Sequence, residues 1–103
     1  MKTQTHRGEV LVVDDEPEVH LMLRGILGDE GYGVVGVENG RKAIEKLRKG
    51  DFSIVLLDVR LPEADGVTIL KDIKRRWPRI PVIMITGFED VEKCVESMRS
   101  GAL

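Results

Sequence analysis

The residues with the clearest capacity for chemistry are acidic side chains that follow short apolar runs. Asp14, Asp15 and Glu16 come directly after one such run, and Asp58 comes directly after another. Carboxylates that lie close together cannot all stay ionised without compensation, so their pKa values would rise. Mg²⁺ relieves such repulsion, because it prefers hard oxygen ligands and is typically held by one or two carboxylates plus a phosphate. The pattern therefore predicts a magnesium site.

A phosphoryl group is the natural reactant for such a site. With a cation in place it can approach an aspartate despite its own charge, and the carboxylate can then act as a nucleophile and form an aspartyl phosphate. Thr86 follows a further apolar run, and its hydroxyl can hydrogen-bond a phosphoryl oxygen, for which Gly87 leaves room. Any one of these aspartates could instead be a helix N-cap; their coincidence at several strand ends favours a site.

Four short apolar, β-branched runs must position these side chains. They lie at residues 10–13, 34–37, 54–57 and 82–85. Each run is short enough to be a strand and continuous enough to be buried on both faces, as in a parallel sheet.

Segments with helical spacing lie between and after these runs. Their apolar positions are Val19, Met22, Leu23, Ile26 and Leu27; Ala43, Ile44 and Leu47; Val67, Leu70, Ile73 and Trp77; and Val91, Cys94, Val95 and Met98. The first helix should end at Gly28 or Gly31. The second has Asn39 as its N-cap and Gly50 beyond its end, and Pro78 stops the third.

Four such strand–helix repeats indicate a doubly wound α/β sheet with right-handed crossovers. In an open sheet of this kind, ligands bind outside the carboxyl ends of the strands. If the first, third and fourth strands are neighbours, three aspartates and the Thr86 hydroxyl converge on one pocket. Glu38 and Asn39 follow the second strand at the same edge.

The cysteine and the histidines are given no chemical role. Cys94 lies on the apolar face of the fourth predicted helix and is interpreted as a packing residue rather than a nucleophile. His20 is expected on the exposed side of the first helix. Neither His6 nor His20 is expected to be a ligand.

Composition predicts one domain in a reducing compartment. The chain has 103 residues, of which 42% are apolar and 33% are charged, and its net charge is −2. This charge gives no general attraction to nucleic acid or to an anionic membrane. A single cysteine excludes an internal disulfide framework, and we find no secretory signal and no apolar run of membrane-spanning length. We therefore expect a soluble cytoplasmic domain.

Three stretches together resemble the receiver domain of bacterial response regulators, the phospho-accepting half of two-component systems. They are VLVVDDEP at 10–17, IVLLDVRLPEADG at 54–66 and PVIMITG at 81–87, with SGAL at the chain's end. The resemblance implies a flavodoxin-like doubly wound parallel sheet. Its strand order, 2-1-3-4, comes from the family and is not worked out from spacing. Residues 9–103 would form the receiver domain and residues 1–8 a flexible lead-in.

The resemblance also implies a role for each matching position. Asp58 would be the phospho-acceptor and a metal ligand. Asp15 would bind Mg²⁺ directly, Asp14 directly or through water, and Arg60 through its backbone carbonyl. Thr86 would be the switch hydroxyl, drawn toward the phosphoryl group on activation. The donor would be the phosphohistidine of a sensor histidine kinase, and the signal would pass as a conformational switch to a downstream output, with transcription favoured. Such a domain assists its own phosphorylation and dephosphorylation but turns over no external substrate.

The sequence departs from the family pattern at its end. A receiver normally continues into a fifth strand, a lysine that pairs with the phosphoryl group and a fifth helix, whereas this sequence stops at Leu103. We therefore expect the fifth strand and helix to be absent from this chain, which would leave residues 82–85 as an apolar sheet edge. Such an edge is a template for self-association or for element swapping.

Three alternatives stay open at this point. A phosphatase of the haloacid dehalogenase type uses an Asp-x-Asp spacing after its first strand, whereas Asp14 and Asp15 are adjacent. A flavodoxin-like cofactor binder should offer hydrogen-bond donors in its first loop rather than negative charge. A pure interaction module, with phosphorylation lost, is kept open by the missing lysine.

Overall fold

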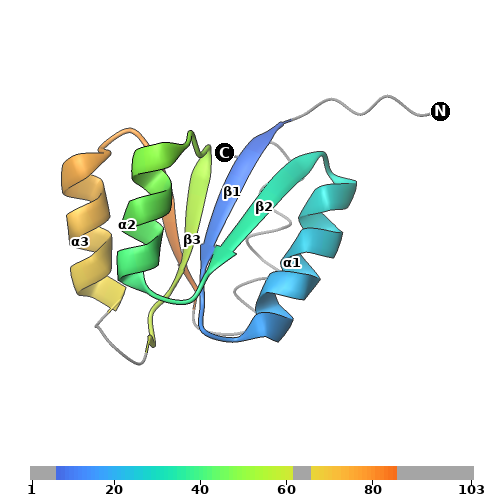
Figure 1. Ribbon diagram of the computed structural model, residues 1–103, viewed down its shortest axis with the longest axis horizontal. Coiled ribbons are helices and arrows are strands. Elements are labelled where there is room, and N and C mark those ends of the chain that lie inside the picture. The colour runs from blue at the N-terminus through green and yellow to red at the C-terminus, as the bar shows by residue number, and fades with distance from the viewer. Residues whose placement is uncertain (1–6, 62–65, 86–103) are drawn as a thin grey trace.

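The computed structural model describes residues 7–61 and 66–85, which form four strands and three helices (Figure 1). In chain order these elements are β1 (Gly8–Val13), α1 (Pro17–Asp29), β2 (Tyr32–Val37), α2 (Gly40–Lys49), β3 (Ile54–Asp58), α3 (Gly66–Arg76) and β4 (Val82–Ile85). All four predicted strands and the first three predicted helices are confirmed. The fourth predicted helix lies outside the described residues. None of the described helices is long and apolar enough to span a membrane.

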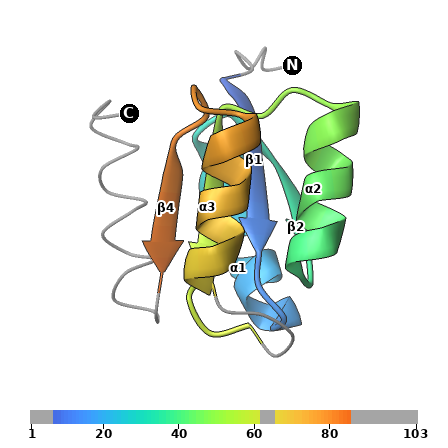
Figure 2. The same ribbon diagram turned by 90° about the vertical axis from the view of Figure 1, so that its left-hand side faces the viewer.

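The strands form one parallel sheet in the order β2-β1-β3-β4, as expected from the resemblance. At the carboxyl edge, Val13 of β1 is aligned with Val37 of β2 on one side and with Leu57 of β3 on the other. Asp58, the last residue of β3, is aligned with Ile85, the last residue of β4. Figure 2 shows β4 at one side of this sheet. The first, third and fourth strands are therefore neighbours at one edge, as the predicted pocket requires.

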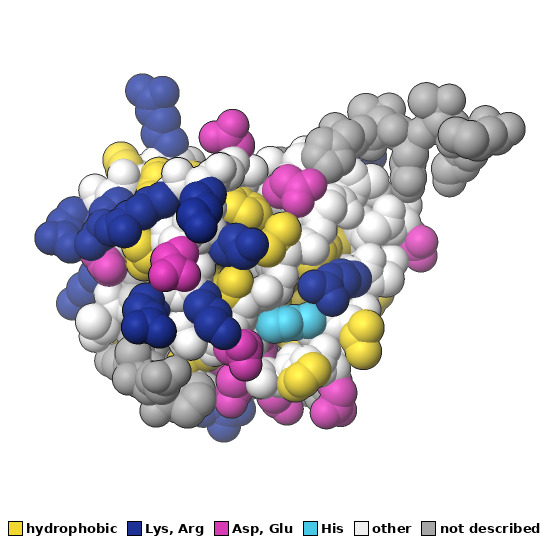
Figure 3. All heavy atoms as spheres, in the orientation of Figure 1, with side chains coloured by type: hydrophobic (Ala, Val, Ile, Leu, Met, Phe, Trp, Pro, Cys, Tyr) yellow, Lys and Arg dark blue, Asp and Glu magenta, His cyan; other side chains and the backbone are white. Residues whose placement is uncertain are grey.

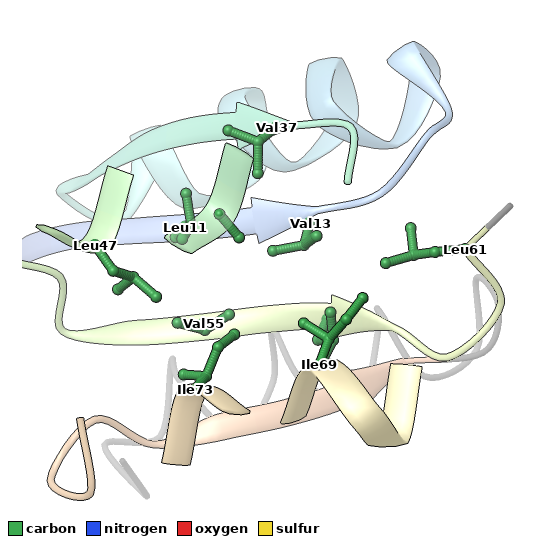
Figure 4. Packing of buried hydrophobic residues seen from close by; sticks show 10 residues of the cluster. Leu11, Val13, Val37, Leu47, Val55, Leu61, Ile69 and Ile73 are labelled. Carbon is green, nitrogen blue, oxygen red and sulfur yellow. The ribbon is translucent and has the colours of Figure 1, made fainter. Parts of the chain in front are cut away.

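The alternation of side chains along the strands builds two cores, one on each face of the sheet. Val10 and Val12 pack against α1 on one face, whereas Leu11 and Val13 pack against α2 and α3 on the other (Figures 1 and 4). All four valine and leucine side chains are fully buried, as are those of the central positions of β3. Truncating a fully buried leucine such as Leu11 to alanine typically costs about 2–5 kcal/mol, so the two central strands are firmly held.

The expectation that every strand is buried on both faces is wrong for the outer two. In β2 only Val37 is buried, and in β4 only Ile85 is buried. Their other residues are partly exposed, because β2 and β4 each have a paired neighbour on one side only among the described strands. An apolar run marks a strand but does not show whether the strand is central.

The ends of α1 and α2 follow the sequence signals closely. Pro17 stands at the first turn of α1, where its missing N–H costs nothing, and Gly31 supplies the positive φ of 93° that turns the chain into β2. Asn39 caps α2 as predicted, because its side-chain oxygen accepts a hydrogen bond of 2.9 Å from the N–H of Lys42. Gly50 is the C-cap of α2, also as predicted.

The predicted apolar face of α3 is partly wrong. Val67 is 44% exposed, whereas Ile69 and Ile73 are buried in the core (Figure 4). The face that α3 buries therefore differs from the predicted one, and close packing at two glycines fixes this orientation of the helix. Gly66 lies directly against the backbone of Val59, and Ile69 lies directly against Gly40 at the start of α2.

The exposed position expected for His20 is also wrong. The ring lies against Gly36 of β2, so closely that a Cβ atom there would sit 2.5 Å from Nδ1. The side chain is half-buried, and its buried Nε2 atom has no hydrogen-bond partner among the residues that the structure describes. The His20 ring can pack here because Gly36 of β2 has no side chain. Helical periodicity within α1 carries no information about this residue of another element.

Candidate functional site

Asp14 continues the line of β1 into the carboxyl edge of the sheet. Its N–H donates a hydrogen bond of 3.0 Å to the carbonyl of Val37, which fixes its backbone to β2. Its Oδ1 accepts a hydrogen bond of 2.8 Å from the N–H of Glu16. These two hydrogen bonds hold Asp14 in place through both the sheet and the local turn, and the residue is only 4% exposed.

Asp58 is held in the same manner at the end of β3. Its Oδ1 accepts a hydrogen bond of 2.9 Å from the N–H of Arg60, two residues further along, and the residue is 8% exposed. The next residue, Val59, donates its N–H to the carbonyl of Ile85 on β4 at 3.1 Å. Asp14, directly after β1, and Asp58, at the end of the adjacent strand β3, therefore each accept a hydrogen bond from the N–H two residues later.

Asp15 and Glu16 complete an acidic cluster beside Asp14. One carboxylate oxygen from each of these three residues lies within 4.8 Å of the others, and Asp15 and Glu16 are exposed. Asp58 lies near enough to repel the Asp14 carboxylate. The structure thus brings together three of the predicted metal ligands, Asp14, Asp15 and Asp58, at one edge of the sheet.

The electrostatics of the cluster are unfavourable as they stand. Burial raises the pKa of Asp14 above its usual value, and repulsion by Asp58, Glu16 and Asp15 raises it further. The hydrogen bond from the N–H of Glu16 acts in the opposite direction but does not cancel these effects. In the part of the chain that the structure describes, no lysine or arginine forms an ion pair with Asp14, Asp15 or Asp58.

This donor set fits Mg²⁺. The cluster offers several carboxylate oxygens, one side of it is open to solvent for water ligands, and no cation among residues 7–61 and 66–85 forms an ion pair with Asp14, Asp15 or Asp58. Glu16 lies in the cluster, as its place directly after Asp15 suggested, although it is not among the predicted ligands. The carbonyl of Arg60 stays a predicted ligand.

Other residues of the predicted edge serve different purposes or lie outside the described residues. Glu38 forms an ion pair of 2.6 Å with Lys42, whose hydrogen bond and charge lower the pKa of this glutamate. Asn39 acts as the helix cap. Thr86 and Gly87 lie outside the described residues, directly after β4.

Comparison with known sequences identifies the family. Residues 10–103 match the family model for the response regulator receiver domain. The transcriptional regulatory protein ZraR of Escherichia coli K12 is 42% identical over 95 residues, which cover 92% of this chain and 22% of ZraR. The chain thus spans about a fifth of the length of this relative.

Solved structures agree in fold and in sequence. The response regulator TrrA of Thermotoga maritima, in complex with Mg²⁺-BeF, superposes with a TM-score of 0.72 at 30% identity, covering 88% of this chain and 79% of TrrA. A structure of the histidine kinase ThkA in complex with TrrA gives a TM-score of 0.72 at 32% identity, covering 78% of this chain and 69% of the matched chain. The sheet order, the acidic edge and the match over residues 10–103 lead to one conclusion: this chain belongs to the response regulator receiver domain family.

Proposed function

We propose that this receiver domain accepts a phosphoryl group on Asp58 from the phosphohistidine of a sensor histidine kinase. The observation that carries the proposal is a buried carboxylate at the end of a central strand, beside an acidic cluster that no described cation neutralises. A matched structure in which a histidine kinase is bound to a response regulator supports the choice of partner.

The two carboxylate oxygens of Asp58 would have separate roles. Oδ1 accepts a hydrogen bond from the N–H of Arg60, which supports Oδ2 as the oxygen that would attack phosphorus. A new P–O bond forms while the P–N bond to the kinase histidine breaks. The electron pair of that bond returns to the ring nitrogen of the histidine. The product is an acyl phosphate on Asp58, with the signal stored as a change in charge and in hydrogen bonding.

Asp14, Asp15, Asp58 and the backbone carbonyl of Arg60 would hold Mg²⁺. The ion would neutralise the cluster and allow an anionic phosphoryl group to approach Asp58. The uncompensated charge at Asp14 supports this assignment, and so does the matched complex of TrrA with Mg²⁺-BeF.

Thr86 would transmit the phosphorylation of Asp58 to the rest of the domain. It directly follows Ile85, which is aligned with Asp58 across the β3–β4 pair, so its position in the chain supports a hydroxyl near the phosphoryl group. Movement of Thr86 would alter the segment after β4 and reach an output domain that controls transcription, as the name of the relative ZraR suggests. In this role the domain works as a cytoplasmic switch and turns over no external substrate. The single cysteine supports that location.

The decisive test is labelling by radioactive acetyl phosphate in the presence of Mg²⁺. The wild-type chain should take up label, Asp58→Asn should take up none, and excess chelator should abolish the labelling of the wild type. Asp51→Asn, an exposed aspartate just before β3, is the matched control and should label normally. Label retained by Asp58→Asn would exclude this residue as the acceptor. A wild-type chain that takes up no label would instead favour a pure interaction module.

We further propose that the chain self-associates through β4 or by exchange of elements. Among the described strands, β4 is paired only with β3, and Val82, Ile83 and Met84 are partly exposed. A strand with one unpaired side offers a row of backbone donors and acceptors to another chain.

A further inference from the structure

Positive charge is concentrated on α2 and α3. The ten residues of α2 include five lysines or arginines and one glutamate, and the eleven residues of α3 include four lysines or arginines and one aspartate. The two helices together therefore carry a charge of +7, whereas the whole chain carries −2, which leaves −9 for the remainder. Figure 3 shows the basic side chains gathered over these two helices.

A groove runs between the two helices on this face. We call it the α2–α3 groove; it has a volume of about 1010 Å³ and is lined by residues of α2, by residues of α3 and by Asn39. Ile69, its most buried lining residue, packs in the core, and Ile44 is half-buried. Arg41, Arg48 and Lys71 line the same groove and are exposed. The groove thus has an apolar interior and a rim on which five lysines or arginines outnumber two acids, Glu45 and Asp72.

Much of the basic charge at the rim is not used within the described structure. Asp72 accepts hydrogen bonds from Arg75 at 2.7 Å and from Arg76 at 3.0 Å, so its negative charge is already neutralised. Its pKa is lowered by these two arginines. Arg41, Arg48 and Lys71 form no ion pair with any described residue. These three cations are therefore available to an anionic ligand.

We propose that the α2–α3 groove binds an acidic, amphipathic segment of a partner protein. Carboxylates of the segment would pair with the basic rim, and its apolar side chains would contact Ile44 and Ile69. This combination favours a polypeptide over nucleic acid, because a phosphate backbone would use the rim but leave the apolar interior unmatched. None of the residues that line the groove belongs to the acidic cluster, so its binding can be tested on the unphosphorylated chain.

The test is fluorescence anisotropy with three probes at low ionic strength, using the 103-residue chain. The first probe is a helical peptide with leucines at i, i+3, i+4 and i+7 and glutamates elsewhere. The second has the same glutamates but serine in place of every leucine, and the third is a short DNA duplex. The first probe should bind most tightly, and its affinity should fall as salt is added.

Charge reversal in the groove, with a matched control, decides whether this surface is responsible. Arg48→Glu with Lys71→Glu should weaken binding of the first probe by about tenfold or more. Lys49→Glu with Arg24→Glu makes the same change in net charge at exposed helix positions outside the groove and should change binding by less than about twofold. Circular dichroism confirms that both double variants are folded. Equal weakening by the two pairs, equal binding of the serine peptide, tighter binding of the duplex or no binding at all would overturn the proposal.

Discussion

At the scale of single residues, the site depends on two aspartates that the backbone holds in the same way. Asp14 and Asp58 each accept a hydrogen bond from the N–H two residues later, and each is nearly buried. This arrangement positions the carboxylates but does not neutralise them. The consequence is clearest at Asp14, whose pKa is raised mainly by burial and then by its acidic neighbours. The ionised Asp14 side chain therefore lowers the stability of the folded chain.

Asp14→Asn should stabilise the chain when Mg²⁺ is removed with chelator. Asparagine keeps the side-chain oxygen that accepts the N–H of Glu16 but removes the buried charge. We expect the melting temperature at pH 7 to rise, because the buried charge and its repulsion by neighbouring acids are removed. In a domain of this size each 1 kcal/mol of stabilisation corresponds to about 4–8 °C. Differential scanning calorimetry measures the melting temperature. Added Mg²⁺ should raise the melting temperature of this variant by less than that of the wild type.

The pH dependence of this effect has a definite sign. Because the pKa of Asp14 is raised in the folded state, the folded chain binds a proton more tightly than the unfolded chain does. The penalty is fully present above the folded-state pKa and is relieved as pH falls through it toward the ordinary value of 3.8. The advantage of Asp14→Asn should therefore shrink over that interval. Asp15→Asn is the exposed control, and an equal gain from it would show that burial is not the cause.

At the scale of elements, the start of α3 determines where the chain after Asp58 can run. A Cβ atom on Gly66 would lie 2.7 Å from the Cα of Val59 and 2.9 Å from the carbonyl oxygen of Asp58. Both contacts are with backbone, which cannot turn aside as a flexible side chain can. The close approach of α3 to the end of β3 thus requires glycine, and it links the packing of this helix to the position of Asp58.

Gly66→Ala should lower the free energy of unfolding by about 1–3 kcal/mol, the usual cost of overpacking, and should slow phosphorylation because the backbone at Asp58 must shift. Gly25→Ala is the matched control, since Gly25 lies in α1 with open space at its Cβ position. It should stabilise the chain by about 0.5–1 kcal/mol. Urea unfolding and labelling measure both variants. A neutral Gly66→Ala would show that the backbone can relax more readily than the packing implies.

At the scale of the whole molecule, charge and strand pairing are distributed unevenly. The acidic cluster gathers at the carboxyl edge, whereas the cations gather on α2 and α3 (Figure 3). The net charge of −2 does not show this separation of acidic and basic surfaces. Net charge therefore predicts only the non-specific attraction of the whole molecule to a partner. Burial in the sheet is also uneven: most residues of β1 and all of β3 are buried in the centre, whereas the outer strands β2 and β4 are mostly partly exposed.

Self-association should appear as a mass that rises with concentration in size-exclusion chromatography with light scattering. Val82→Lys, a charged residue at the first position of β4, should shift the equilibrium toward monomer, because lysine on an outer strand opposes edge-to-edge pairing. Circular dichroism confirms that the variant folds. A stable monomer at every concentration of the wild-type chain would contradict the proposed association.

The local features of this protein could be predicted from its sequence. Apolar runs located the strands, Asn39 and Gly50 marked the limits of α2, and the acids that follow 10–13 and 54–57 marked the site. These features depend on hydrogen bonds and periodicities that span only a few residues, so they can be found without knowing the neighbours. The strand order needed the resemblance to the family, and the structure confirmed it.

Tertiary structure alone decided which distant residues meet. The packing of His20 on Gly36, the rotation of α3 against Gly40 and the partial exposure of β2 depend on contacts between separate elements. The basic groove likewise forms because both helices cover the same face of the sheet (Figure 1). Local periodicity fixes the direction of a side chain relative to its own element. Only the packing of the elements fixes what that side chain faces, and that is why these features could not be predicted from the sequence.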